Sequence, residues 1–73
     1  MVERKINRLK VVLAEKDKTS RWLAEELGYT ESMISRWVSN KKQTTLEVLY
    51  EISLLLKVDI RNLIESNGEL FRK

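Results

Sequence analysis

The chain has 73 residues and contains neither cysteine nor histidine. Disulfide bonds are therefore excluded, and a zinc site built on the usual sulfur and nitrogen ligands is almost excluded. This length predicts one small domain over residues 1–73, with no room for a separate sensor or catalytic domain. The net charge is +3 and the basic excess lies in residues 1–44, which suit a phosphate-binding surface, although +3 alone is also typical of an ordinary protein surface.

The N-terminal segment lacks the apolar run that a signal peptide needs. The longest uncharged apolar run, Ile52 to Leu56, is far shorter than the roughly 20 residues that span a bilayer. We therefore expect a soluble, cytoplasmic protein without a membrane partner. Proline is absent and glycine occurs twice, so the chain has few breaks and we expect an all-α fold.

Apolar spacing predicts the first two helices. A first helix over about residues 3–16 is indicated by four apolar residues at helical intervals, namely Ile6, Leu9, Val12 and Leu13. A second helix over about residues 20–27, with Thr19 as its N-cap, would bury Leu23, Ala24 and Leu27.

A tight turn follows the second helix. Gly28 comes four residues after the small Ala24, where the chain must leave the helix with positive φ, which glycine tolerates best. Thr30 can cap a third helix over about residues 31–39, and Ile34 and Trp37 mark its buried face. This arrangement predicts a helix-turn-helix, in which the later helix usually lies in the major groove of DNA.

A loop over residues 40–44 precedes the fourth helix. Asn40 can adopt the left-handed conformation that ends a helix, and Thr44 with Glu47 fits the capping box of a helix over about residues 45–56. This helix is apolar on more than one side, whereas a surface helix needs one apolar stripe. Either neighbouring helices cover most of it, or a second copy of the protein covers part of it, and we favour the dimer. The predicted interface residues are Leu54, Val58, Ile60, Leu63 and Ile64.

The last predicted element is short. Asp59 caps a fifth helix that runs through about Glu65, and residues 66–73 are expected to form a loose tail. Together these elements predict an all-α fold, a compact five-helix bundle whose core spans about residues 3–65.

The exposed face of the third helix is the candidate base-reading surface. Its short serines let the backbone approach base edges, and Arg36 can bond guanine O6 and N7. The role of Glu31 is left open: it can stabilise the helix dipole, or it can accept a hydrogen bond from cytosine N4. The same residue types are also common on ordinary solvent-exposed helix faces. We favour a DNA-binding face here because the helix follows the turn of a predicted helix-turn-helix. The predicted base-reading residues are Glu31, Ser32, Ser35 and Arg36.

Phosphate contacts need hydrogen-bond donors and positive charge around this face. The start of the second helix, the start of the third and the loop after it supply them, namely Ser20, Arg21, Thr30, Lys41, Lys42 and Thr44. Tryptophan side chains can also stack on bases. Trp37, however, has the helical phase of the core, and Trp22 is expected to lie half-exposed over a neighbouring helix.

These patterns resemble the lambda-repressor-like helix-turn-helix family, the Cro/XRE class of small bacterial and phage transcription regulators. The resemblance covers about residues 5–65 and rests on Arg8-Leu9-Lys10, Leu23-Ala24, Gly28, Ile34-Ser35, the Leu46-to-Leu56 helix, Val58-Asp59-Ile60 and Leu63-Ile64. It implies a compact five-helix domain that commonly dimerises on operator DNA. By position, it implies base contacts from Glu31, Ser32 and Arg36, with phosphate contacts near Ser20, Thr30, Lys41, Lys42 and Thr44.

Three departures from the family pattern stand out. Ser20 replaces a glutamine that in many members bridges phosphate and base, and serine is too short for both contacts. Leu13 and Val38 replace an Arg–Glu ion pair, which suggests an apolar contact that need not weaken the fold. Asn40 replaces a glycine and is an acceptable substitute.

The resemblance and the residues together predict a sequence-specific, double-stranded-DNA-binding transcription regulator without a cofactor or metal. We expect a repressor that binds a palindromic operator as a homodimer. The alternative is an antitoxin-type module that neutralises a partner protein, a toxin or other regulator, and autoregulates, as the apolar residues Leu54, Leu63, Leu70 and Phe71 suggest. An enzyme is the poorest hypothesis, because histidine and cysteine are absent and the carboxylates are scattered.

Overall fold

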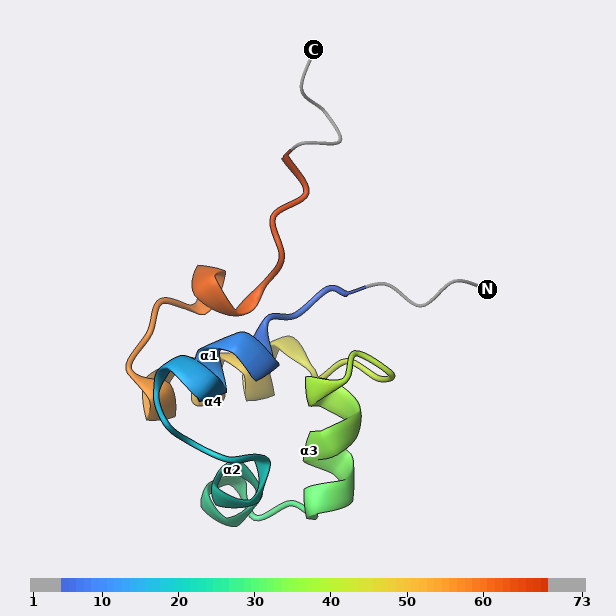
Figure 1. Ribbon diagram of the computed structural model, residues 1–73, viewed down its shortest axis with the longest axis vertical. Coiled ribbons are helices and arrows are strands. Elements are labelled where there is room, and N and C mark those ends of the chain that lie inside the picture. The colour runs from blue at the N-terminus through green and yellow to red at the C-terminus, as the bar shows by residue number, and fades with distance from the viewer. Residues whose placement is uncertain (1–4, 69–73) are drawn as a thin grey trace.

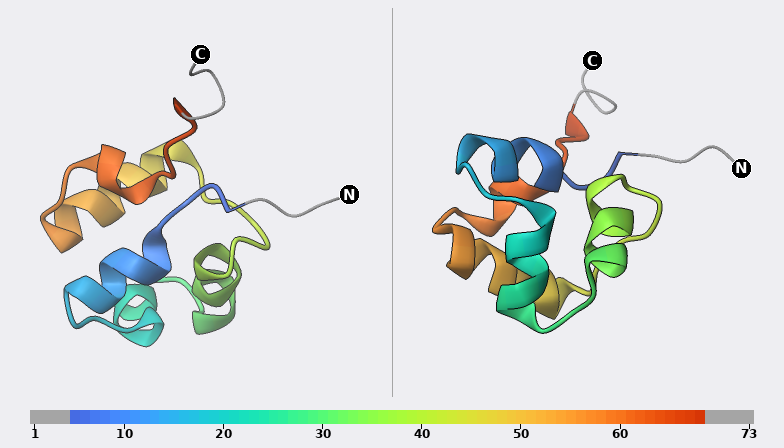
Figure 2. Two further views of the ribbon diagram at one scale, coloured as in Figure 1. Left: turned by 45° about the horizontal axis from the view of Figure 1, so that its top comes forward. Right: turned by 60° about the horizontal axis from the view of Figure 1, so that its bottom comes forward.

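The computed structural model describes residues 5–68, which contain four α-helices and one 3₁₀ turn, η1. The elements are α1 (Leu9–Glu15), α2 (Ser20–Leu27), α3 (Glu31–Val38), α4 (Leu46–Leu56) and η1 (Ile60–Leu63). Helices α2 and α3 pack side by side, with α2 seen end-on and α3 upright in Figure 1 and the turn between them visible in Figure 2. Within residues 5–68, no helix has the length and apolar character needed to cross a membrane.

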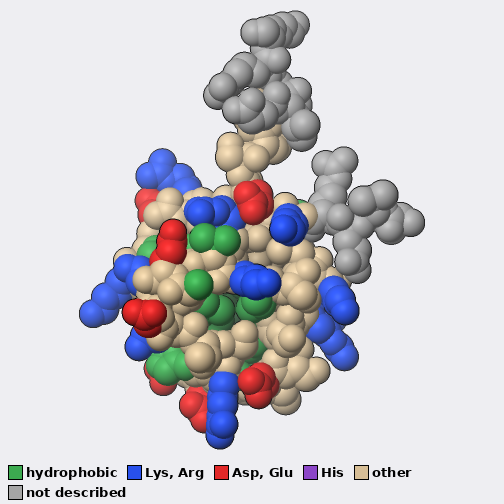
Figure 3. Space-filling view, viewed as in Figure 1, with side chains coloured by type: hydrophobic (Ala, Val, Ile, Leu, Met, Phe, Trp, Pro, Cys, Tyr) green, Lys and Arg blue, Asp and Glu red, His purple; other side chains and the backbone are tan. Residues whose placement is uncertain are grey.

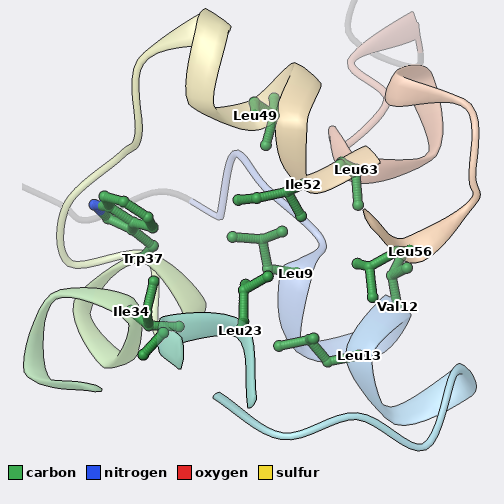
Figure 4. Close-up of a cluster of buried hydrophobic side chains, with 11 residues drawn as sticks. Leu9, Val12, Leu13, Leu23, Ile34, Trp37, Leu49, Ile52, Leu56 and Leu63 are labelled. Atoms are coloured by element: carbon green, nitrogen blue, oxygen red, sulfur yellow. The ribbon is translucent and has the colours of Figure 1, made fainter. Parts of the chain in front are cut away.

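One apolar core joins all five elements (Figure 4). Each element contributes at least one side chain with 0% exposure, namely Leu9, Leu23, Ile34, Ile52 and Leu63. Burying a side chain of this size contributes about 1.5–3 kcal/mol of stability. Because α1, α2, α4 and η1 all reach this core, the side of α3 that carries Ile34 is held inward and its opposite side faces out.

The boundaries of α2 and the start of α3 agree with the predicted ones because strong local signals fix them. The Thr19 hydroxyl accepts a hydrogen bond from the Trp22 N–H at 3.0 Å, and Thr30 accepts one from the Met33 N–H at 3.2 Å. Gly28 has φ of 76° and its N–H donates to the Ala24 carbonyl at 2.9 Å. A Cβ at Gly28 would meet no atom within 4 Å, so glycine is needed for backbone conformation rather than for space.

The predicted start of the first helix is wrong. Helix α1 begins at Leu9, and the preceding Asn7 forms an isolated antiparallel bridge with Ile64. The Arg8 N–H donates to the Leu63 carbonyl at 2.9 Å, and the Glu65 N–H donates to the Ile6 carbonyl at 2.7 Å. The Asn7 side chain accepts a bond from the Leu9 N–H at 3.1 Å, an alternative to helical backbone bonding that asparagine offers readily.

The predicted fifth helix is also wrong, so the described residues form four α-helices rather than five. Asp59 caps the segment as expected, accepting a bond from the Arg61 N–H at 2.8 Å, but only one 3₁₀ turn follows. Ile64 is already extended, at φ −122° and ψ 137°, because it pairs with Asn7. Of the predicted loose tail, residues 69–73 lie outside the described residues.

The N-cap of α4 is one residue later than predicted. Thr45, not Thr44, accepts the hydrogen bond from the Val48 N–H, at 3.2 Å. Glu47 therefore occupies the second helical position and not the third, which a capping box requires. Asn40 does adopt the predicted left-handed conformation, with φ of 62°.

Candidate nucleic-acid interface

The outer face of α3 is exposed, as predicted. Glu31, Ser32, Ser35, Arg36 and Ser39 all lie on the molecular surface. On the opposite side, Ile34 is fully buried and Trp37 is 5% exposed. The core therefore fixes the rotation of the helix about its axis, and a face of short polar side chains and one arginine remains open to a ligand.

Arg36 keeps its charge available for a ligand. Among residues 5–68, the ion pairs join Arg21 to Glu25 and Arg61 to Asp59, and neither involves Arg36. Its guanidinium has N–H donors in a planar fork, the geometry that fits guanine O6 and N7.

Glu31 is the first residue of α3, and Thr30, not Glu31, supplies the side-chain cap. An exposed carboxylate in the first turn interacts favourably with the helix dipole by about 0.3–1 kcal/mol. Its position therefore agrees with both predicted roles, dipole stabilisation and base contact.

Candidate phosphate donors surround this face at three places. Thr30 is exposed and Ser20 half-buried, and both lie where helix N-termini present backbone N–H groups. Arg21 Nε lies 3.8 Å from Glu25 Oε2, and both side chains are strongly exposed, so this ion pair is weak. Thr44 is half-buried and its hydroxyl donates to the Thr45 carbonyl, so a phosphate contact through its proton requires a rotation of the side chain.

The loop after α3 carries the remaining donors. Lys41 and Lys42 are exposed, and their backbone N–H groups both donate to the Arg36 carbonyl, at 2.9 and 3.3 Å. These bonds hold the two lysines at the end of α3 that also carries Arg36. In Figure 3, Lys and Arg side chains project along the edge of the molecule formed by α3 and this loop.

A cluster of three amide side chains, absent from the sequence-based predictions, lies behind this loop. Asn7, Asn40 and Gln43 are hydrogen-bonded to one another, although Asn7 is 33 residues from Asn40. Asn7 is 5% exposed and also donates to the Trp37 carbonyl at 2.8 Å, in the last turn of α3. The spacing that placed Asn7 inside a helix concealed this role, and only the left-handed tendency of Asn40 gave a signal.

The rings of both tryptophans are in contact with other side chains of the protein. Trp37 belongs to the core, as predicted, and Tyr29 meets its ring edge-on at a centroid distance of 5.5 Å. Trp22 is half-buried, and Lys18 Nζ lies 4.7 Å from its ring centroid, so one ring face already has a cation against it. Leu13 is buried and Val38 packs on the same core, which agrees with an apolar replacement for an ion pair.

The predicted dimer residues divide by exposure. Leu54 is 61% and Ile64 39% exposed, whereas Val58 and Ile60 are half-buried against the core. Leu63 is 0% exposed, so its prediction as an interface residue is wrong, because the core of its own chain already surrounds it.

Two exposed apolar residues of α4 were missed. Leu46 is 71% and Tyr50 55% exposed, and with Leu54 they repeat every four residues along one side of the helix. We call Leu46, Tyr50 and Leu54 the α4 stripe. The spacing was visible in the sequence, but which apolar side of α4 meets the core was not.

Comparisons with known proteins agree with this geometry. A family model described as the Cro/C1-type HTH DNA-binding domain matches residues 8–69. A crystal structure of "a putative DNA-binding protein from Bacteroides fragilis" superposes with a TM-score of 0.81 at 57% sequence identity, over 82% of this chain and 97% of that one. No curated protein is significantly similar to the chain.

Proposed function

Because the chain belongs to the Cro/C1-type family of helix-turn-helix DNA-binding domains, we propose that it is a repressor that binds a palindromic operator as a homodimer. The chain is a DNA-binding regulator domain; the operator symmetry, the repression and the dimer are the proposal. One observation supports sequence-specific binding through α3: this helix exposes Ser32, Ser35 and Arg36 while buried Ile34 and Trp37 fix its orientation.

In the proposed complex, α3 lies in the major groove. Arg36 donates two hydrogen bonds to a guanine, a contact that contributes about 1–3 kcal/mol of discrimination between bases. Ser32 and Ser35 bond to neighbouring base edges, and Glu31 either accepts from a cytosine or stabilises the helix dipole.

Phosphates on either side of the groove set the position of α3. The N-termini of α2 and α3 offer backbone N–H groups to them, together with Ser20, Arg21 and Thr30. Lys41 and Lys42 reach the backbone from the loop, with Thr44 beside them. These contacts carry charge but no sequence information, so they raise affinity for every duplex alike.

The proposed dimer uses apolar surface that is exposed among residues 5–68. The α4 stripe and Ile64 are exposed, and Leu46, Tyr50 and Ile60 line one hollow. A domain of this size buries only about 60% of its unfolded surface, so association adds stability. Two copies would place their α3 helices in successive major grooves, about 34–36 Å apart.

Selection of bound duplexes from a random DNA pool at about 150 mM salt tests the proposal, because charge-driven non-specific binding is partly suppressed there. The expected result is an inverted repeat with half-sites about one helical turn apart. Enrichment of a single half-site would contradict the dimer, and no enrichment would contradict sequence-specific binding. Sedimentation of the free protein and of a Tyr50→Glu variant tests the α4 stripe separately.

We also propose, as an alternative, that the domain is an antitoxin-type module that binds a partner protein. A hollow lined by Glu26, Leu27, Glu51, Leu54 and Leu55 supports it, because exposed apolar surface beside acidic side chains suits a basic partner. Of the other residues in that hypothesis, Leu63 is buried, and Leu70 and Phe71 lie outside the described residues. A stable one-to-one complex with a purified partner, together with weak DNA binding, would favour this function.

A further inference from the structure

Asn40 connects two segments that are distant in the sequence. Its Oδ1 accepts hydrogen bonds from the Ile6 N–H at 2.8 Å, the Asn7 N–H at 2.9 Å and Gln43 Nε2 at 3.0 Å. Its Nδ2 donates to the Asn7 carbonyl at 3.1 Å. One side chain therefore binds the segment before α1 to the loop after α3.

Asn7 completes the connection from the other side. Its Nδ2 donates to the Trp37 carbonyl at 2.8 Å and to Gln43 Oε1 at 2.7 Å. The Trp37 carbonyl lies in the last turn of α3, and it also accepts a hydrogen bond from the Asn40 N–H at 3.1 Å. Among residues 5–68, no buried side-chain nitrogen or oxygen is left without a partner, so each buried polar atom of the cluster has at least one hydrogen bond.

Lys41 and Lys42 lie between the two loop members of this cluster, Asn40 and Gln43. Their backbone N–H groups bind the Arg36 carbonyl, and their side chains are exposed. Both ends of this two-residue span are thus anchored while the charged side chains stay in solvent. A span that is ordered in advance loses less conformational entropy when it binds a ligand.

Ending a helix does not by itself require this asparagine. Glycine adopts the left-handed conformation at less cost, and it would end α3 equally well. The asparagine side chain adds four hydrogen bonds that glycine lacks, and all but one of them reach residues more than 30 positions away.

We infer that Asn7, Asn40 and Gln43 form a positioning cluster that holds Lys41 and Lys42 in place to bind the DNA backbone. The inference rests on the proposed function, because it assigns these lysines to phosphates. The cluster acts through the loop and does not touch the DNA itself.

The principal test is Asn40→Gly, which keeps the backbone conformation and removes only the side-chain bonds. Its affinity for the selected operator at about 150 mM salt is expected to fall roughly 5- to 10-fold, equally for all duplexes. Amide hydrogen exchange at residues 41–43 of the free protein is expected to accelerate. The matched control is Asn67→Gly, the same substitution at an exposed position outside the cluster. It should change neither the operator affinity nor the amide exchange at residues 41–43.

A double-mutant cycle separates positioning from a general loss of stability. In a Lys41→Ala/Lys42→Ala background, Asn40→Gly is expected to cost almost no further affinity, since the groups that it positions are gone. Additive losses would overturn the inference, as would unchanged affinity or unchanged exchange in Asn40→Gly.

Failure of the inference is distinguishable from failure of the proposed function. If the lysine variants weaken binding and Asn40→Gly does not, only the positioning role is overturned. If the lysine variants bind DNA as tightly as the parent, the phosphate assignment fails, and the positioning role with it. Should Asn40→Gly fail to fold, Gln43→Met replaces it, with an expected loss of about 2- to 5-fold, and unchanged affinity in that variant overturns the inference.

Discussion

The two ends of helix α3 are held in different ways. At its start, Thr30 caps the Met33 N–H from three residues away. At its end, the Trp37 carbonyl receives a hydrogen bond from Asn7, 30 residues earlier in the chain. The start therefore depends on its own sequence, whereas the end and the loop after it depend on local backbone bonds and also on residues 6–7 before α1. We therefore expect the proposed DNA contacts at the two ends to respond to different mutations.

The largest effect is expected at the end that depends on tertiary structure. Asn7→Ala removes one of the two hydrogen bonds to the Trp37 carbonyl and leaves the Leu9 N–H and Gln43 Oε1 without their partner. Each buried group left unsatisfied costs about 1–3 kcal/mol. We expect the free energy of unfolding in urea to fall by about 3 kcal/mol. Asn67→Ala, at an exposed site, should change it by less than about 0.5 kcal/mol. Unchanged stability in Asn7→Ala would mean that water satisfies these groups.

The helix face and the loop are compared directly by two substitutions. Arg36→Ala should relax specificity at one base position by about 1–3 kcal/mol. Lys42→Ala should weaken binding to all sequences alike and reduce the slope of log affinity against log salt by about 0.9. Titrations of operator and single-base variants at several salt concentrations measure both. If Arg36→Ala also scales every site equally, the assignment of Arg36 to base contact is wrong.

A smaller effect is expected at the locally held start of α3. Thr30→Ala removes the cap and should lower the free energy of unfolding by about 1 kcal/mol, with Thr30→Ser close to the parent. Amide exchange should accelerate in the first turn of α3 and remain unchanged at residues 41–43. Acceleration at both ends would show that the two ends are not independent.

The smallest effect is expected at η1, which leads into the pairing of residues 63–65 with residues 6–8. Side-chain and backbone hydrogen bonds from Arg61 lower the pKa of Asp59 below its ordinary value of 3.8. A lowered folded-state pKa stabilises the protein above the unfolded pKa, and this stabilisation is lost as pH falls through the folded value. The stability difference between the parent and Asp59→Asn should therefore narrow below about pH 3.8. An NMR titration of the Asp59 carboxyl group that gives a pKa of 3.8 or above would contradict this.

Sequence patterns located the helix-turn-helix well because its signals lie within a few residues of their effects. The local signals act on the next or the preceding helical turn, as for Thr19, Thr30 and Gly28. Their roles could therefore be predicted from the sequence without knowledge of the tertiary structure. The exposed side of α3 followed from the phase of Ile34 and Trp37.

The segment before α1 and the segment after α4 were predicted less well for the opposite reason. Ile6 has the right phase for a helix starting near residue 3, yet it is 49% exposed, because the backbone around it pairs with residues 63–65. Similarly, the helix over residues 45–56 is apolar on more than one side, and Leu46 on one of these sides is 71% exposed. Helical spacing identifies the apolar sides of a helix, but it does not predict which of these sides packs against the core.

The sequence by itself determined the helical class, the caps and hinge of the helix-turn-helix, and the polar face of α3, because side-chain hydrogen bonds and helical periodicity act over three or four residues. Only the tertiary structure determined that Asn7 lies outside the first helix, that Ile64 is extended and that Asn40 binds the segment before α1. Those contacts join residues more than 30 positions apart, and their free energy exists only after the core has brought both segments together.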